Sequence, residues 1–178
     1  MADTCDFLKT YYEALGEFIH AFSYAEISVQ DAMTSILDIP YRTSLPLLRG
    51  MGLKQKIDSI RSFYKEYQLD IDPLLDETLS QLVHILNFRN DLLHSGALWN
   101  EDGSMFVDNL NKTTNPKKYK ETPVSVELLR TISRDLEKIM TRLEIYTYVK
   151  LTNTEQFEAD KKEASKISFQ YKPYTKNK

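Results

Sequence analysis

The sequence is poor in the residues that interrupt helices or cross-link chains. It has only five glycines and six prolines among 178 residues, which favours long helices over a many-turned β fold. Cys5 is the only cysteine, so no disulfide can form within the chain and an oxidising compartment gains no support. A chain of this length buries enough surface to fold without such staples. These shortages predict a single all-α domain.

Long apolar runs are also missing from the sequence. No stretch approaches the roughly 18 apolar residues of a membrane-spanning helix. Residues 1–9 contain Asp3 and Asp6 and lack the apolar core of a secretory signal. We therefore expect a cytoplasmic protein that has no membrane partner.

Charge is distributed unevenly around a net value of −3. Residues 1–40 contain seven acidic residues and one lysine, whereas residues 41–65 contain six basic residues and one aspartate. At helical spacing, Lys54, Arg61 and Lys65 share one face and are candidate RNA contacts. The same pattern also fits solvated helix surfaces of opposite sign, and both interpretations stay open.

Hydrophobic periodicity predicts four amphipathic helices. Apolar residues recur every three or four positions over residues 8–37, 51–67, 73–95 and 125–146. Asp72, before Pro73, and Ser125 are the expected helix caps. Short apolar runs around Asp102-Gly103 predict a β-hairpin at about 97–107.

The segments between and after these helices complete the expected architecture. Residues 40–46 and 109–122 are expected to be loops, and the apolar pattern fades after Thr152. The prediction is an up-down four-helix bundle over residues 1–152, with the hairpin between its third and fourth helices. Residues 153–178 would be a charged, Lys-rich tail, either flexible or an RNA-binding arm.

One short motif closes the third predicted helix. Arg89 is followed by the polar Asn90 and, after four intervening residues, by His94. This motif at the end of helix three of four resembles the HEPN superfamily of helical ribonucleases. At about 100° per residue Asn90 and His94 share a helix face, whereas Arg89 is offset from His94 by about 140°. Either the arginine side chain wraps round, the helix end distorts, or two copies of the motif meet across a dimer.

The resemblance implies a metal-independent endoribonuclease that acts as a homodimer with a composite cleft and needs no cofactor. His94 would be the general acid or base, because histidine titrates near neutral pH. Arg89 would hold the phosphate, and Asn90 would orient His94 or bind the phosphate. The ribose 2′-OH would attack, leaving a 2′,3′-cyclic phosphate. The same resemblance suggests a toxin–antitoxin or phage-defence setting, with a protein antitoxin or inhibitor as a possible partner.

Other interpretations of the same residues stay open. Arg89 pairs with Asp76 or Asp91 in the simplest structural alternative, and His94 merely ends a helix. Glu26 either positions a basic group in the cleft or lies at the edge of the apolar stripe. The chain would then be a non-catalytic HEPN-like bundle that binds RNA, a nucleotide or a protein, or a plain helical interaction module. The spacing of histidine and cysteine predicts no metal site.

Overall fold

The structure is a computed structural model in which residues 2–100, 104–109, 119–148 and 154–171 are described. The described residues are mostly helical, as expected, and a small antiparallel sheet adjoins the helices. The helices are α1 (Ala2–Ile36), α2 (Tyr41–Leu48), α3 (Leu53–Glu66), α4 (Pro73–Ser95), α5 (Val126–Thr147) and α6 (Thr154–Ser165). The strands are β1 (Leu98–Trp99), β2 (Met105–Asp108) and β3 (Glu121–Val124).

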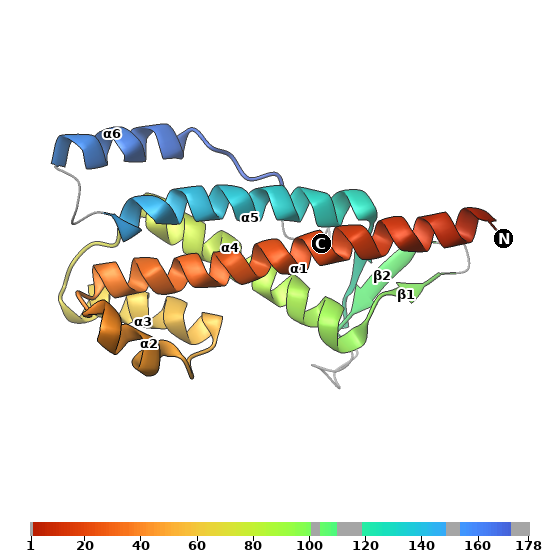
Figure 1. Ribbon diagram of the computed structural model, residues 1–178, viewed down its shortest axis with the longest axis horizontal. Helices are drawn as coiled ribbons and strands as arrows, with labels where there is room; N and C mark the ends of the chain where they lie inside the picture. The colour runs from red at the N-terminus through yellow and green to blue at the C-terminus, as the bar shows by residue number, and fades with distance from the viewer. Residues whose placement is uncertain (1, 101–103, 110–118, 149–153, 172–178) are drawn as a thin grey trace.

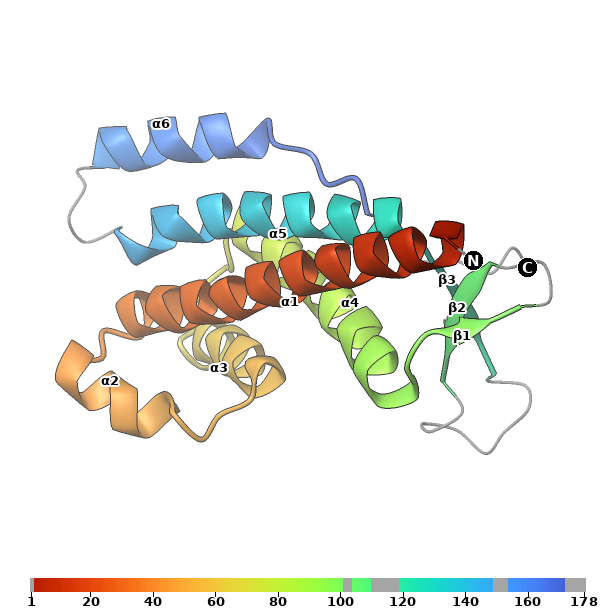
Figure 2. The ribbon, with the colours of Figure 1, turned by 45° about the vertical axis from the view of Figure 1, so that its right-hand side comes forward.

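The two long helices α1 and α5 lie side by side and run in the same direction (Figure 1). Both begin near the sheet, and their last turns meet again where Ile36 and Tyr146 line one cavity. Helix α4 crosses this pair, α3 and α2 lie against the C-terminal half of α1, and α6 lies along α5 (Figure 2). The alternating up-down order that the sequence predicts is not confirmed.

The apolar stripes form one core between these helices. Phe18, Ile57 and Leu136, from α1, α3 and α5, have no exposed surface. Burying such side chains stabilises the fold by roughly 1.5–3 kcal/mol each. None of the described helices combines the length and the apolar character needed to cross a membrane.

The predicted caps are confirmed at the starts of α4 and α5. The carboxylate of Asp72 accepts a 2.9 Å hydrogen bond from the N–H of Leu74, and Pro73 takes the first helical position. The hydroxyl of Ser125 accepts a 3.0 Å bond from the N–H of Leu128. Short polar side chains at these two positions therefore fix where the chain turns into a helix.

The expected hairpin is present and is joined by a third strand. Leu98 pairs with Phe106 and Trp99 with Met105, while residues 101–103 of the predicted turn lie outside the described part. The prediction of a loop over 109–122 is wrong at its end, because β3 pairs antiparallel with β2. This strand escapes the sequence pattern because it is short and contains Pro123, which edge strands tolerate.

The segment at 40–46 was expected to be a loop, and this prediction is wrong. Helix α2 forms there with Pro46 inside it. Proline at this sixth position removes the N–H that would bond the carbonyl one turn earlier, and α2 ends two residues later at Leu48. Ser44 and Leu48, one turn apart, are both 1% exposed and attach α2 to the bundle.

Part of the segment predicted to be a charged C-terminal tail is helical. Helix α6 and the segment that follows it, Ile167–Tyr171, pack against α4 and α5 (Figure 1). We call residues 167–171 the C-terminal strap. Its carbonyl at Ile167 accepts a hydrogen bond from the 2% exposed Arg142, whose guanidinium carbon also lies 4.4 Å from the Phe169 ring centroid.

A second buried charge holds the far end of the strap. Asp135 on α5 has no exposed surface and accepts hydrogen bonds of 2.8 Å and 2.6 Å from the N–H groups of Gln170 and Tyr171. Lys138 balances this carboxylate at 2.9 Å. Buried charges need such partners, since leaving one unpaired is strongly destabilising. The strap is thus an integral part of the fold.

Candidate active site

The end of α4, which carries the Arg89–His94 motif, is fixed from several sides. Phe88 is buried against Phe18 of α1, with ring centroids 5.9 Å apart. The N–H of Gly96 closes the helix on the carbonyl of Leu92 at 3.1 Å. Ser95 donates a 3.1 Å hydrogen bond to the carbonyl of Asp108 in β2. The motif therefore lies on a rigid element at the junction of the helices and the sheet (Figure 2).

The side chain of Arg89 contacts its neighbour in the motif and an aromatic ring of α1. Its Nη1 donates a 3.1 Å hydrogen bond to Oδ1 of Asn90, and its guanidinium carbon lies 5.4 Å from the ring centroid of Phe22 on α1. Asp76, one of the two carboxylates considered as a partner, is instead bound by Arg61 at 2.7 Å.

One nitrogen of the Arg89 guanidinium, Nε, has no hydrogen-bond partner among the described residues. This nitrogen is buried. Buried donors are nearly always satisfied, so an unsatisfied one needs an explanation such as a ligand or an adjustable side chain. The guanidinium is therefore held at two points but keeps donor capacity.

His94 is exposed and lies in the last turn of α4. It follows Asn90 by one helical turn, which places the two residues on the same face. Arg89 is joined to Asn90 by its hydrogen bond. Three polar groups with the chemistry of a phosphate site thus follow one another at an accessible helix end.

Glu26 lies one turn beyond Phe22 on α1, and its side chain is 38% exposed. Its carboxylate is 3.9 Å from Nζ of Lys56, a residue of α3 that also donates a 3.0 Å hydrogen bond to Gln30. Glu26 therefore faces a basic group at the edge of the apolar stripe. That group is Lys56, which the sequence analysis did not single out.

The three basic residues of α3 are not gathered around the motif. Arg61 bonds Asp76 and Ser80 near the start of α4, and Ser80 precedes His94 by about 21 Å of helix. Lys54 is exposed and pairs with Asp58 at 2.6 Å. Lys65 is exposed in the last turn of α3. Arg61 therefore stabilises the contact between α3 and α4.

Sequence reasoning did not find the neighbours that other elements supply to the motif. Phe22 was part of the apolar stripe, and nothing in its spacing shows that it lies under Arg89. Tyr171 of the strap packs on Phe88 at 6.0 Å between ring centroids. Burial and the nearby Asp91 raise the pKa of Tyr171 to about 12. These contacts join segments far apart in the chain.

A set of exposed apolar side chains, the apolar patch, adjoins the motif. Phe7 and Trp99 are in edge contact at 5.6 Å, and Tyr12, Leu93 and Trp99 line one hollow of about 250 Å³. Leu93 directly precedes His94. The members of the patch are Phe7, Tyr12, Leu93, Leu98 and Trp99, which are 38–63% exposed.

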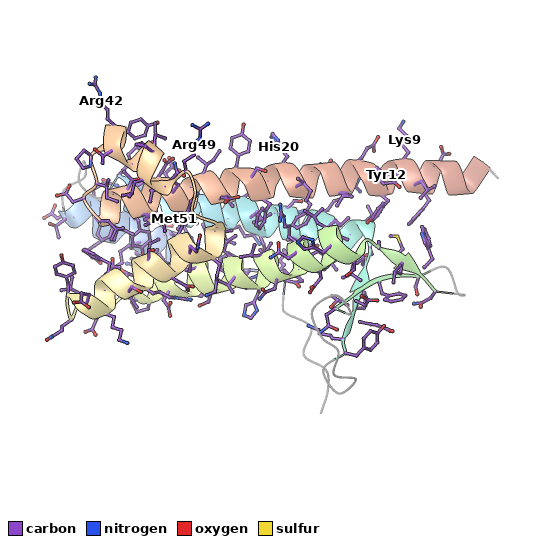
Figure 3. The ribbon with its side chains drawn as sticks, turned by 90° about the horizontal axis from the view of Figure 1, so that it is seen from below. Lys9, Tyr12, His20, Arg42, Arg49 and Met51 are labelled. Carbon is purple, nitrogen blue, oxygen red and sulfur yellow. The ribbon has the colours of Figure 1, made fainter. Side chains whose placement is uncertain are left out.

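The other histidines and the acidic residues give no metal centre in the part of the chain that the structure describes. His20 projects from α1 on the side away from α4, as does Lys9 (Figure 3). His84 is exposed three turns before His94.

No family model, curated protein or solved structure matches the chain. The candidate site therefore depends on its own geometry.

Proposed function

We propose that this protein is a metal-independent endoribonuclease of the HEPN type. The observation that carries the proposal is the hydrogen bond from Arg89 to Asn90, one turn before the exposed His94 at a fixed helix end. A cation, an amide and an imidazole at one accessible surface are the groups that phosphate transfer without a metal requires.

In the proposed reaction, His94 removes the proton of a ribose 2′-OH, and the 2′ oxygen attacks the adjacent phosphorus. The bond from phosphorus to the 5′ oxygen breaks, and the leaving oxygen takes a proton from water, which gives a 2′,3′-cyclic phosphate and a 5′-hydroxyl. Arg89 binds the phosphate oxygens through its planar fork and offsets their charge in the transition state. Asn90 holds Arg89 through Oδ1, which leaves its amide N–H groups to donate to the phosphate.

The apolar patch supports the homodimer that the resemblance implies. Patches of this kind on a soluble surface commonly mark protein interfaces, and Trp and Tyr are frequent anchors there. Because Leu93 belongs to the patch and precedes His94, a second copy bound there would place two motifs close together. A toxin or defence effector held by a protein inhibitor is the proposed setting, and it comes from the resemblance alone.

The patch also favours a second candidate function, a non-catalytic bundle that binds a protein partner. Its exposed Trp99 and Tyr12 suit such an interface whether or not the motif is active. The two candidates differ in what happens when His94 is replaced. Only the enzyme loses its function with this side chain.

Cleavage of a mixed RNA pool in EDTA tests the proposal. Wild type is compared with His94→Ala and Arg89→Lys, and the product ends are assayed for cyclic phosphate. We expect cutting by wild type, with rates lower by about 10²–10⁴ for His94→Ala and by about 10²–10³ for Arg89→Lys. Lysine keeps the charge of Arg89 but loses its planar fork.

The chain offers control residues of the same two types. His84→Ala removes an exposed histidine from α4, and Arg134→Ala removes an exposed arginine that pairs only weakly with Glu127 at 3.4 Å. Both should cut like wild type. Equal loss in His84→Ala and His94→Ala would contradict the assigned role, and absence of cutting by folded wild type would favour the binding module.

A further inference from the structure

A second distinctive site lies at the other end of α4, roughly 33 Å along the helix from His94. It is a cavity of about 410 Å³ where α1, α3, α5 and α6 come together. Four aromatic rings and two carboxylates dominate its lining, namely Phe63, Tyr64, Tyr146, Phe157, Asp70 and Asp72. None of these residues takes part in the proposed nuclease.

The electrostatic environment of this cavity favours a cation. Helices α1, α3 and α5 all end beside it, at Ile36, Glu66 and Thr147, and residues from the last turn of each contribute to its wall. A helix C-terminus carries a partial negative charge of about one half. The N-terminus of α4, which Asp72 caps, and the first turn of α6, which carries Phe157, offset part of this negative charge. Asp70 adds a full negative charge to the wall.

The protein's own Lys161 shows which chemistry this wall accepts. Its Nζ lies 2.6 Å from the Asp72 carboxylate and 5.3 Å from the Phe157 ring centroid. An ammonium group is thus already held between a carboxylate and an aromatic face, as in cation–π recognition. Asp72 is neutralised by this contact, whereas the exposed Asp70 has no ion pair or hydrogen bond with any described residue.

A buried phenol also lies in this wall. Tyr146 is only 3% exposed, and burial and the neighbouring Asp72 carboxylate raise the pKa of its hydroxyl. A phenol that stays protonated beside a carboxylate directs its proton to that carboxylate. Its oxygen can then accept an N–H group from a ligand.

We propose that this cavity binds a small organic ammonium ion. The aromatic rings would cover its apolar stem, and Asp70 and the Tyr146 hydroxyl would receive its N–H groups. A metal ion is disfavoured, because Ca²⁺ takes about six to eight oxygen ligands, and no cluster of three metal-binding side chains occurs among the described residues. The inference is independent of the nuclease.

Titration with n-butylammonium chloride, followed by NMR of the aromatic side chains, tests the site. We expect saturable shifts of Tyr64, Tyr146 and Phe157 in the wild-type protein. Butan-1-ol, which has the same stem without the charge, and sodium chloride at equal ionic strength should not reproduce them. Equal binding of the alcohol, or shifts that never saturate, would overturn the proposal.

Two variants assign the contacts. Asp70→Asn removes the charge from an exposed residue and should weaken binding about five- to tenfold. Tyr146→Phe should also weaken binding severalfold, because it removes the oxygen that would accept an N–H group of the ligand. Glu13→Gln removes an exposed carboxylate from the distant half of α1 and should bind like wild type. Unchanged affinity in Asp70→Asn would overturn the proposal.

Discussion

Asp72 serves two parts of the structure with one side chain. Its Oδ1 accepts the N–H of Leu74 and starts α4, while its Oδ2 binds Lys161 of α6 at 2.6 Å. Burial alone would raise the pKa of this carboxyl. The hydrogen bonds from Lys161, Leu74 and Tyr146 outweigh burial, and the pKa of Asp72 is lowered. The ionised form is therefore the one that stabilises the fold.

The linkage between this pKa and stability gives a test. Because the pKa is lowered in the folded state, the stabilisation is present above the ordinary carboxyl pKa of about 3.9 and is lost as the pH falls through the folded-state value. Asp72→Asn keeps a good helix cap but loses the charge, and should lower the free energy of unfolding at pH 7 by about 1–2 kcal/mol. Urea unfolding at several pH values should show the two proteins converging below pH of about 4.

The control for this prediction is Asp58→Asn. Asp58 pairs with Lys54 at the same 2.6 Å, but both side chains are about half exposed. An exposed pair contributes about 0.5 kcal/mol or less. A loss in Asp72→Asn no larger than in Asp58→Asn, or one that persists in acid, would contradict the role given to the ion pair.

At the scale of elements, local chemistry predicts the helices that have caps and apolar stripes. The starts of α4 and α5 follow from Asp72 and Ser125, because a cap needs only neighbouring residues. Helix α2 could not be predicted, since it is short and depends on tertiary contacts of Ser44 and Leu48. Polar α6 was missed for a similar reason, as it has only one buried residue, Ala164.

Replacing each of two glycines by alanine should change the free energy of unfolding in opposite directions. Gly96 ends α4 with φ 71° and ψ 172°, a conformation that only glycine adopts readily, although a Cβ there would meet no atom within 4 Å. Gly96→Ala should therefore lower the free energy of unfolding by about 1–3 kcal/mol. Gly16 lies in mid-α1 with equal room, and Gly16→Ala should raise it by about 0.5–1 kcal/mol.

Urea unfolding of both variants measures these two changes in the free energy of unfolding. The comparison isolates the backbone, because neither new methyl group has a neighbour to clash with. Equal effects of the two substitutions would show that the backbone conformation at Gly96 does not govern the end of α4. Loss of RNA cleavage in Gly96→Ala beyond its loss of folded protein would link this helix end to His94.

At the scale of the whole molecule, the sequence predicted a helical class but not the arrangement. The candidate residues Arg89, Asn90 and His94 could be proposed from the sequence because they lie on one helix. Phe22 and the strap were not, because a periodic pattern shows which residues are buried but not what they are buried against. The buried charges of Asp135 and Arg142, which hold the strap, resemble ordinary surface charges in the sequence.

The apolar patch makes a prediction about assembly. If a second copy covers it, wild type should sediment as a dimer at micromolar concentration. Trp99→Glu places a charge where Trp99 contacts Phe7, and should weaken self-association by about 2 kcal/mol, which is roughly thirtyfold in Kd. Sedimentation velocity over a concentration series measures the oligomeric state of the wild type and the Kd for self-association of Trp99→Glu.

Tyr41→Glu is the matched control, since Tyr41 on α2 is 66% exposed and lies outside the patch. It should sediment like wild type. If dimerisation builds the active cleft, Trp99→Glu should also cut RNA more slowly at low protein concentration and recover as concentration rises, because mass action restores the dimer. A monomeric wild type that cuts RNA with the same specific activity at every concentration would leave the nuclease intact and exclude the dimer.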